Sequence, residues 1–132
     1  MTTRVFGSPL CYPVQVHEVS FYRTKAGHCP VEEFLDALDG KQTQKVVWVL
    51  RLIEELEIVP SQYLKKLVDT EGLWEVRVQF GGDTFRLLGF FDGRRLLVLT
   101  TGFAKKTERI PRQELELAAN RKQDYQRRKS DH

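Results

Sequence analysis

The chain has 132 residues, of which 41% are hydrophobic, so it is long enough for one domain with a substantial core and too short for two. Its formal net charge of +3 favours a polyanionic partner only where Lys and Arg cluster, as they do between residues 105 and 129. No apolar run approaches the roughly 20 residues that cross a bilayer, and residues 1–13 lack the apolar centre of a secretory signal. We therefore expect a cytoplasmic protein without membrane association.

The cysteines and histidines do not form a metal-binding pattern. Cys11 and Cys29 fit neither a disulfide framework nor the spacing of metal ligands, so reduced thiols are expected. His17 and His28 each stand without a second His, Cys or carboxylate at ligand spacing. The sequence predicts no metal site and no cofactor.

The N-terminal residues differ from the rest of the chain. Residues 1–13 contain Gly7, Pro9 and Pro13 without hydrophobic periodicity, so we predict a flexible arm, followed by a single domain over residues 14–127. The first strand is predicted from apolar residues whose register changes near His17. They are Val14, Val16, Val19, Phe21 and Tyr22.

Two helices are predicted next. Pro30 suits a first helical turn, and apolar side chains follow at helical spacing until Asp39-Gly40. A second helix is predicted from about Lys41 to Glu57, before Pro60. Because the link is short, the helices should pack side by side on one face of a sheet and leave the opposite face open as a cleft.

Residues 72–106 are predicted to form a three-stranded antiparallel meander with turns at Gly81-Gly82-Asp83 and Asp92-Gly93. Residues 63–68 before it form either the start of a strand or a loop. In the first meander strand apolar and polar residues alternate, so one face belongs to the core and the other carries charge. The core residues are Trp74, Val76, Val78 and Phe80, and the charged face holds Glu75, Arg77 and Gln79.

The next two strands are apolar at nearly every position from Phe85 to Leu99, as in strands covered on both sides. Pro111 then opens a last helix with a thin apolar stripe, and from Arg121 onward this helix is so polar that its end should fray. The element order is β-α-α-β-β-β-α, with three or four strands in its second half. This order predicts an α+β fold: a small antiparallel sheet with the two N-terminal helices packed on one face.

Arg86 interrupts the apolar second strand of the meander. A guanidinium stays charged in a protein, so at a half-buried position it needs a carboxylate, a water-lined cleft or a ligand phosphate. Glu75 could pair with Arg86 or Arg77, and this structural alternative stands beside the ligand alternative. Lys65 and Lys66 are either solvated edge lysines or part of a basic surface. Further cations follow the third strand, so several should converge on one end and face of the sheet: Lys105, Lys106, Arg109 and Arg112.

These segments form an ordered set. Its members are Leu64-Lys65-Lys66-Leu67, Leu73-Trp74-Glu75-Val76-Arg77-Val78, Phe85-Arg86-Leu87-Leu88 and Gly102-Phe103-Ala104-Lys105-Lys106-Thr107 before Pro111. Over about residues 19–120 the chain resembles the phage-derived Gp49-like branch of the RelE/ParE superfamily, which includes the HigB toxins. The Gly-Phe-x-Lys-Lys-Thr segment before a Pro-led helix is the most specific part of this resemblance.

The resemblance implies a RelE-like fold and the toxin of a type II toxin–antitoxin system. Such a toxin inhibits translation as an mRNA interferase, an endoribonuclease that cuts mRNA in the A site of the 70S ribosome. The implied partner is a helix-turn-helix, HigA-like antitoxin. By position the resemblance implies Arg77 and Arg86 as the site arginines, Lys65 or Lys66 as basic residues entering the sheet, and Lys105 and Lys106 as the basic pair after the last strand. We therefore predict that the catalytic residues are Arg77, Arg86, Lys105 and, from the charge pattern, Glu75. The predicted RNA-binding residues are Lys65, Lys66 and Lys106, to which the charge pattern adds Arg109 and Arg112.

RNA cleavage without a metal needs a proton acceptor for the 2′-hydroxyl, cations that stabilise the phosphorane, and a proton donor for the 5′-oxygen. The arginines supply the cations. A lysine crowded by other cations or Glu75 could be the base, and Tyr125 and His132 leave the general acid unassigned. Two alternatives stay open: a gyrase-directed, ParE-like toxin, and a non-catalytic module that binds RNA or the ribosome through the same basic face.

Overall fold

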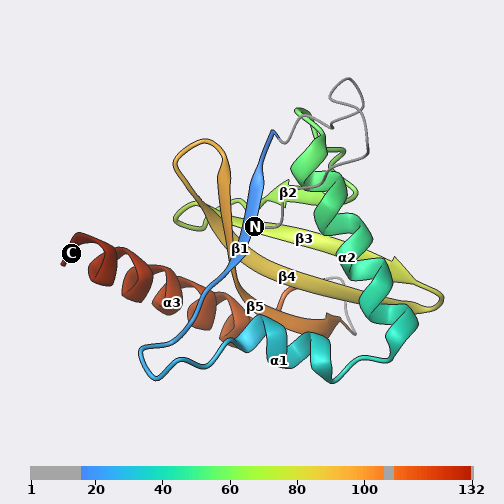
Figure 1. Ribbon diagram of the computed structural model, residues 1–132, viewed down its shortest axis with the longest axis horizontal. Helices are drawn as coiled ribbons and strands as arrows, with labels where there is room; N and C mark the ends of the chain where they lie inside the picture. The colour runs from blue at the N-terminus through green and yellow to red at the C-terminus, as the bar shows by residue number, and fades with distance from the viewer. Residues whose placement is uncertain (1–15, 106–108, 132) are drawn as a thin grey trace, which may run out of the picture.

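In the computed structural model, which describes residues 16–105 and 109–131, a five-stranded sheet lies between two layers of helices (Figure 1). The strands are β1 (Glu18–Phe21), β2 (Leu64–Lys66), β3 (Leu73–Phe80), β4 (Asp83–Asp92) and β5 (Leu96–Lys105). The helices are α1 (Pro30–Asp36), α2 (Gly40–Glu55) and α3 (Arg112–Ser130). The strand order is β1-β5-β4-β3-β2. The predicted α+β class is confirmed, and the predicted arm at residues 1–13 lies outside the described residues.

The predicted meander is present as β3, β4 and β5. Phe80 pairs with Asp83, so Gly81 and Gly82 alone make the first turn, and Gly81 has a φ of 60° that a side chain would strain. Gly93, with a φ of 79°, begins the turn from β4 to β5. The turn residues therefore fix the register of the three central strands.

The sheet differs from the prediction in one feature and settles a second that was left open. β1 pairs with β5 in parallel, with Glu18 opposite Leu96, so the sheet is mixed rather than antiparallel. The connection between these strands spans both N-terminal helices and three strands, and so long a connection leaves the direction of pairing free. The segment whose assignment was open does form a strand, β2, at the other edge of the sheet.

The boundary between the N-terminal helices also differs. We expected the first helix to end at Asp39-Gly40, but α1 ends at Asp36 and Asp39 caps α2. The Asp39 carboxylate accepts a hydrogen bond from the Gln42 backbone N–H at 2.8 Å, and the Gln42 side chain accepts one from the Asp39 N–H at 3.0 Å. This capping box pairs two backbone N–H groups that would otherwise lack a partner at the start of α2. Asp39, which we expected at the end of the first helix, therefore marks the beginning of the second. α2 ends at Glu55, two residues before the predicted Glu57.

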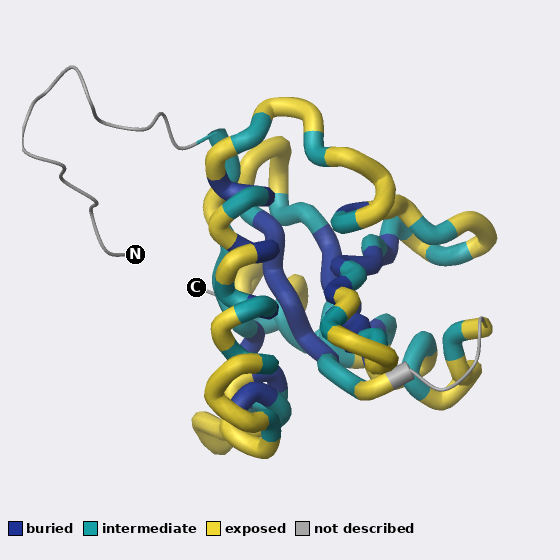
Figure 2. Tube along the Cα trace, turned by 90° about the vertical axis from the view of Figure 1, so that its right-hand side faces the viewer, coloured by how far each residue is buried: buried dark blue, intermediate teal, exposed yellow. Residues whose placement is uncertain are grey.

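The main core lies between the sheet and the pair α1 and α2. The apolar face predicted for β3 packs there with residues from all the other elements of this layer, and Figure 2 shows the buried residues along the central strands and the inner side of the helices. The fully buried members include Val31, Val46, Val49, Ile53, Val76, Val78, Leu87, Leu97 and Leu99. The prediction that both N-terminal helices cover one face of the sheet is confirmed by this cluster.

The opposite face is not wholly open, contrary to the expectation of a cleft. Helix α3 packs on β4 and β5, where Ala118 is buried against Leu73 and Leu88. The end of α3 also does not fray, because its polar residues bind the sheet. The Tyr125 hydroxyl donates to Asp92 at 2.8 Å, and Lys129 Nζ lies 2.7 Å from the same carboxylate. A polar helix end is therefore held by specific partners rather than by an apolar stripe.

Candidate functional site

The charged side chains of β2, β3 and β4 share one face of the sheet. Residues directly opposite one another in neighbouring strands point to the same side, and Arg77 lies opposite Arg86 while Lys65 lies opposite Glu75. Lys105 lies opposite Thr84, two residues before Arg86, so its strand position belongs to this face as well. The backbone register thus brings the two arginines, Glu75, Lys65 and the Lys105 position together, on the face that carries α3.

Arg86 and Glu75 form a buried ion pair. Arg86 Nη1 contacts Glu75 Oε2, and both side chains are only 2% exposed. A buried charge without a partner would cost several kcal/mol or more, so each group makes the burial of the other tolerable. Of the two alternatives for Arg86, an internal carboxylate partner is therefore present. Glu75 also offsets the repulsion that two arginines directly opposite one another would otherwise suffer.

Arg77 is the arginine of this face that reaches solvent. Its side chain is 32% exposed, and its Nη2 lies 3.9 Å from Glu75 Oε1, a long and weak contact. The backbone N–H of Arg77 donates to the Tyr63 carbonyl at 2.9 Å, which fixes the residue between β2 and β4. The guanidinium is therefore held by its strand and stays open to a ligand.

The predicted basic residues do not all lie with Arg77. Lys65 is exposed on the same face, whereas Lys66 alternates to the opposite face beside its strand partner Trp74. Arg109 is exposed between β5 and α3, and Arg112, the exposed first residue of α3, lies 3.6 Å from Glu116 on the helix surface. Lys106 lies outside the described residues. The adjacent lysines Lys65 and Lys66 therefore lie on opposite faces of the sheet, and only Lys65 shares the face of Arg77.

The sequence alone did not single out two residues that lie at this face, Phe103 and Arg121. Phe103 lies directly opposite Arg86 in β5 and packs against the buried cluster of Leu73, Leu88 and Ala118, so it helps to cover the buried pair. Arg121 donates from α3 to the Thr100 carbonyl at 2.8 Å, and its burial lowers the pKa of its guanidinium. Arg121 stands in a run of polar residues where nothing marks it out, whereas Phe103 belongs to the Gly-Phe-x-Lys-Lys segment.

Tyr125 lies at the other end of α3. Its ring packs on Phe90 with 5.3 Å between ring centroids, and Phe90 is four residues from Arg86 along β4, a distance of about 13 Å in an extended strand. Burial, followed by the hydrogen bond to Asp92, raises the pKa of Tyr125 to about 12. Tyr125 therefore binds α3 to the sheet and does not adjoin Arg77, and His132 lies outside the described residues.

The two histidines that the structure describes, His17 and His28, each contact an oxygen atom of the protein. His17 Nδ1 lies 2.9 Å from the Ile53 carbonyl, and His28 Nδ1 lies 3.6 Å from a Glu33 carboxylate oxygen at the surface. Within residues 16–105 and 109–131, no three His, Cys, Asp or Glu side chains gather in a group that could hold a metal ion. None of the helices in these ranges has the length and apolarity needed to cross a membrane.

Comparison with known proteins identifies the family. The family model described as phage derived protein Gp49-like (DUF891) matches residues 33–123, which contain α2, the whole meander, the Arg77 face and most of α3. No curated protein matches the chain. The matched family is that of the HigB/RelE-like toxins, so it supports the toxin of a toxin–antitoxin system, for which an antitoxin is the natural partner. The chain belongs to the phage-derived Gp49-like family of HigB/RelE-like toxins.

Proposed function

We propose that this chain is a metal-independent endoribonuclease toxin that cleaves mRNA on the ribosome by attack of the RNA 2′-hydroxyl. The observation that carries the proposal is Arg77, one-third exposed on a sheet face that it shares with exposed Lys65 and lying beside the buried Arg86–Glu75 pair. A partly exposed guanidinium held on a rigid strand suits the recognition of phosphate, because its donors form a planar fork.

In the proposed mechanism Arg77 contacts the scissile phosphate. The phosphorane that forms on 2′-hydroxyl attack carries more negative charge than the starting diester, so a fixed cation stabilises it more than the ground state. Arg86 is the positioning residue. By neutralising Glu75, it keeps that carboxylate from capturing Arg77 completely, and the Arg77 charge remains available to the substrate.

The remaining basic residues serve binding and proton transfer. Lys65 contacts the RNA backbone beside Arg77, and exposed Arg109 and Arg112 extend the basic surface beyond β5. Lys105 and Lys106 are assigned to the same role from their place in the sequence alone. The base that accepts the 2′-hydroxyl proton must touch the substrate. Because Glu75 is 2% exposed and paired with Arg86, a lysine of this face is the better candidate. The partner that neutralises the toxin is a helix-turn-helix antitoxin of HigA type.

Substitution of Arg77 tests the proposal. We expect Arg77→Ala to slow the cleavage of ribosome-bound mRNA by roughly 100- to 1,000-fold, the usual cost of one donor to a transition-state oxyanion. The readout is the mapping of mRNA ends and growth arrest after induction. The matched control is Arg94→Ala, which removes an exposed arginine from the turn between β4 and β5. Equal cleavage by wild type and Arg77→Ala would remove the basis of the proposal.

The chemistry of the ends tests the metal-independent route. Attack by the 2′-hydroxyl leaves a cyclic phosphate or 3′-phosphate and a 5′-hydroxyl, whereas metal-assisted hydrolysis leaves a 3′-hydroxyl and a 5′-phosphate. Because ribosomes carry Mg²⁺, the chemistry of the ends decides between the two routes, and we expect a 5′-hydroxyl end. Intact mRNA with broken or relaxed DNA would instead indicate a gyrase-directed toxin. Salt-sensitive RNA binding without cleavage on ribosomes would indicate a non-catalytic module.

A further inference from the structure

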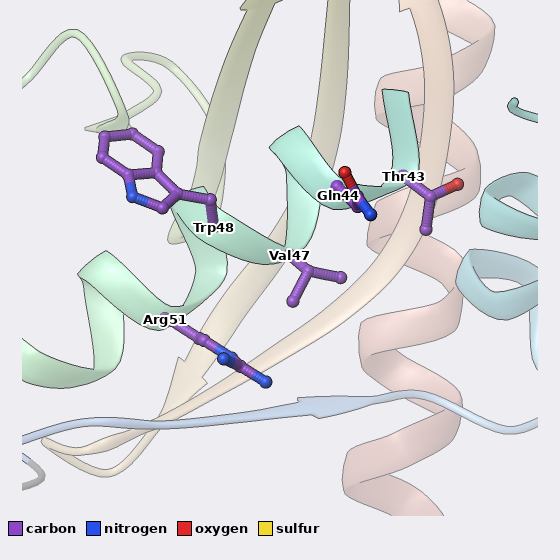
Figure 3. A pocket seen from close by; sticks show the side chains of 5 residues that line it. All are labelled: Thr43, Gln44, Val47, Trp48 and Arg51. Carbon is purple, nitrogen blue, oxygen red and sulfur yellow. The ribbon is translucent and has the colours of Figure 1, made fainter. Parts of the chain in front are cut away.

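A pocket at the end of α3 differs in its lining from a pocket on the outer side of α2. In the α2 pocket Arg51 is the one charged lining residue, and Asp39 and Glu55 flank the pocket along the same helix (Figure 3). The pocket at the end of α3 has a volume of about 400 Å³. Three aromatic and three cationic side chains line it: Phe21, Tyr22, Arg23, Tyr125, Arg128 and Lys129. The pocket at the end of α3 therefore brings several rings and several positive charges together.

Two segments that are far apart in the sequence form this pocket. Phe21 is the last residue of β1, and the chain that leaves β1 runs beside the end of α3 (Figure 1). The Tyr22 hydroxyl donates a hydrogen bond to Asp124, and Arg128 donates one to the Arg23 carbonyl. These contacts fix the two segments relative to one another, so the pocket is part of the fold.

The charges of this region have a small positive excess. Residues 18–26 and 122–131 contain six Lys or Arg residues and three Asp or Glu residues. Two further carboxylates meet these cations from other elements, Asp92 from β4 and Glu32 from α1. The count alone does not decide which sign of charge a ligand meets, so the exposure of each group matters.

The cations of the pocket are more exposed than the two carboxylates that hold α3. The side chains of Arg23 and Lys129 are 59% and 61% exposed. Those of Asp92 and Asp124 are 22% and 23% exposed, and each accepts a hydrogen bond from a tyrosine hydroxyl. A ligand that enters from solvent therefore meets the cations first.

Both exposed cations have donors left for a ligand. Lys129 Nζ contacts the two Asp92 carboxylate oxygens at 2.7 and 2.8 Å, and an ammonium group has three N–H donors. Arg23 makes two long contacts, 3.4 Å to the Gly27 carbonyl and 3.3 Å to Glu32, and a guanidinium has five donors. Contacts of this length between exposed groups contribute little to stability, so the Arg23 side chain is available to a phosphate.

Aromatic rings form the apolar part of the pocket. Phe21 is half-buried, the Tyr125 ring meets Phe90 edge-on, and the Arg128 guanidinium lies 5.4 Å from the centroid of the Tyr22 ring. Rings beside cations suit single-stranded RNA, because each nucleotide offers a flat base and a phosphate. An acidic peptide would use the cations and leave the rings unused.

We propose that this pocket holds one nucleotide of single-stranded RNA, with its base against Phe21 and Tyr125 and its phosphate on Arg23 and Lys129. The inference deepens the proposed function, on which it rests, by adding an RNA contact outside the face of Arg77. β1 lies three strand spacings from β3, about 14 Å across the sheet, and α3 packs on the two strands between them. Messenger RNA and the RNA of the ribosome are two sources of this same chemistry.

The test measures binding of the full chain to a fluorescently labelled RNA of six uridines, without ribosomes. Arg23→Gln should weaken binding by about 4-fold at about 0.15 M salt and reduce the slope of log K against log salt by about 0.7, the share of one phosphate. Phe21→Leu should weaken binding by about 5-fold or more. It should leave the binding of an abasic RNA of equal length unchanged, because it removes base stacking alone. The control is Lys41→Gln, at an exposed position in the first turn of α2, which should change neither quantity.

A second measurement, with purified 70S ribosomes, separates the two sources. Weaker binding of Arg23→Gln to the six-uridine RNA supports the pocket with a free strand as its ligand, and weaker binding to ribosomes alone supports it with RNA of the ribosome. Wild-type affinity for both would overturn the inference, as would an equal loss in Lys41→Gln. Because Arg23 is at the surface, this holds even if Phe21→Leu fails to fold. A chain that binds RNA through Arg23 yet cleaves no mRNA keeps the pocket and refutes the nuclease proposal.

Discussion

Glu75 contacts two arginines that differ in exposure, the buried Arg86 and the partly exposed Arg77. It lies diagonal to Arg86, with which it is buried, and two positions before Arg77, which it meets only at 3.9 Å. The buried carboxylate thus neutralises the Arg86 guanidinium and makes only a weak contact with that of Arg77. This division of roles makes Arg86 a structural residue with an influence on Arg77.

Removal of Arg86 should be costly. Arg86→Ala leaves the Glu75 carboxylate buried without its closest partner, so we expect the free energy of unfolding to fall by about 3–5 kcal/mol. The double variant Glu75→Leu with Arg86→Met replaces both charges by apolar groups and should lose less than Arg86→Ala alone. Urea unfolding measures both. A double variant that is less stable than Arg86→Ala would show that the ion pair contributes a net stabilisation, beyond neutralising two buried charges.

Gly89 and Gly102 both stand where a side chain would collide, but with different neighbours. A Cβ at Gly89 would overlap the Val98 carbonyl oxygen and lie 2.9 Å from Leu99 Cα, at the β-bulge between Leu88 and Gly89. A Cβ at Gly102 would lie 2.6 Å from a ring carbon of Phe34. Because a side chain can shift and a paired strand cannot, Gly89→Ala should lower the free energy of unfolding by more than Gly102→Ala, for which we expect about 1–3 kcal/mol. Thermal or urea unfolding that reverses this order would contradict the expectation.

The sequence could predict which charged residues share a face, but not which of them is buried. Period-two alternation in β3 placed Glu75 and Arg77 together, as found. The burial of Arg86 depends on Phe103 and on α3, which follow it in the chain and whose position no local pattern indicates. The sequence could also have predicted that Lys65 and Lys66 lie on opposite faces, because neighbouring residues of a strand point to opposite sides.

At the scale of whole elements, the local signals succeeded where they describe local structure. The glycine turns fixed the meander, and helical spacing found both N-terminal helices. The parallel pairing of β1 with β5 joins segments that are far apart in the sequence, and no local sequence pattern predicts it. The position of α3 was missed for a related reason: its apolar stripe is thin, and polar contacts with the end of β4 hold its second half.

The polar attachment of α3 should respond to acid. The Asp124 carboxyl accepts hydrogen bonds from Tyr22 and Arg128, which lower its pKa to about 2. The ordinary value is about 3.9, so the folded state holds the charged form more strongly than the unfolded state does. The stabilisation is therefore present above about pH 4 and lost as the pH falls through about 2.

Asp124→Asn isolates this contribution. The difference in free energy of unfolding between wild type and Asp124→Asn should be constant above about pH 5 and shrink steadily between about pH 4 and pH 2. Denaturant unfolding across this range measures the difference. Asp36→Asn, at an exposed position on α1, is the control. A gap between wild type and Asp124→Asn that persists to pH 2 would show that the charge of Asp124 is not what holds α3.

At the scale of the molecule, the face of Arg77 and the outer surface of α2 lie on opposite sides of one sheet. Arg77 and Lys65 face the α3 side, whereas α2 with Lys45 and Trp48 covers the other. The sheet thus separates a basic surface, which we propose binds RNA, from the surface of α2. Substitutions on the two sides should act independently.

The salt dependence of RNA binding should reveal this separation. Each phosphate contact to single-stranded RNA contributes about 0.7 to the slope of log K against log salt concentration. We expect Arg77→Ala and Lys65→Ala each to reduce the slope by about this amount, and Lys45→Ala to leave it unchanged. Fluorescence titration of a short RNA at several salt concentrations measures the slope. An equal reduction by Lys45→Ala would show that RNA also reaches the α2 side.

The pairing of β1 with β5 sets the moment at which a newly made molecule becomes complete. β1 is the first described strand and β5 the last, so the β1 edge of the sheet stays unfilled while every element between them is being synthesised. A nascent polypeptide must release β5 from the exit tunnel before its opening strand finds a neighbour. The sheet of a growing chain is therefore complete only after β5 has left the ribosome.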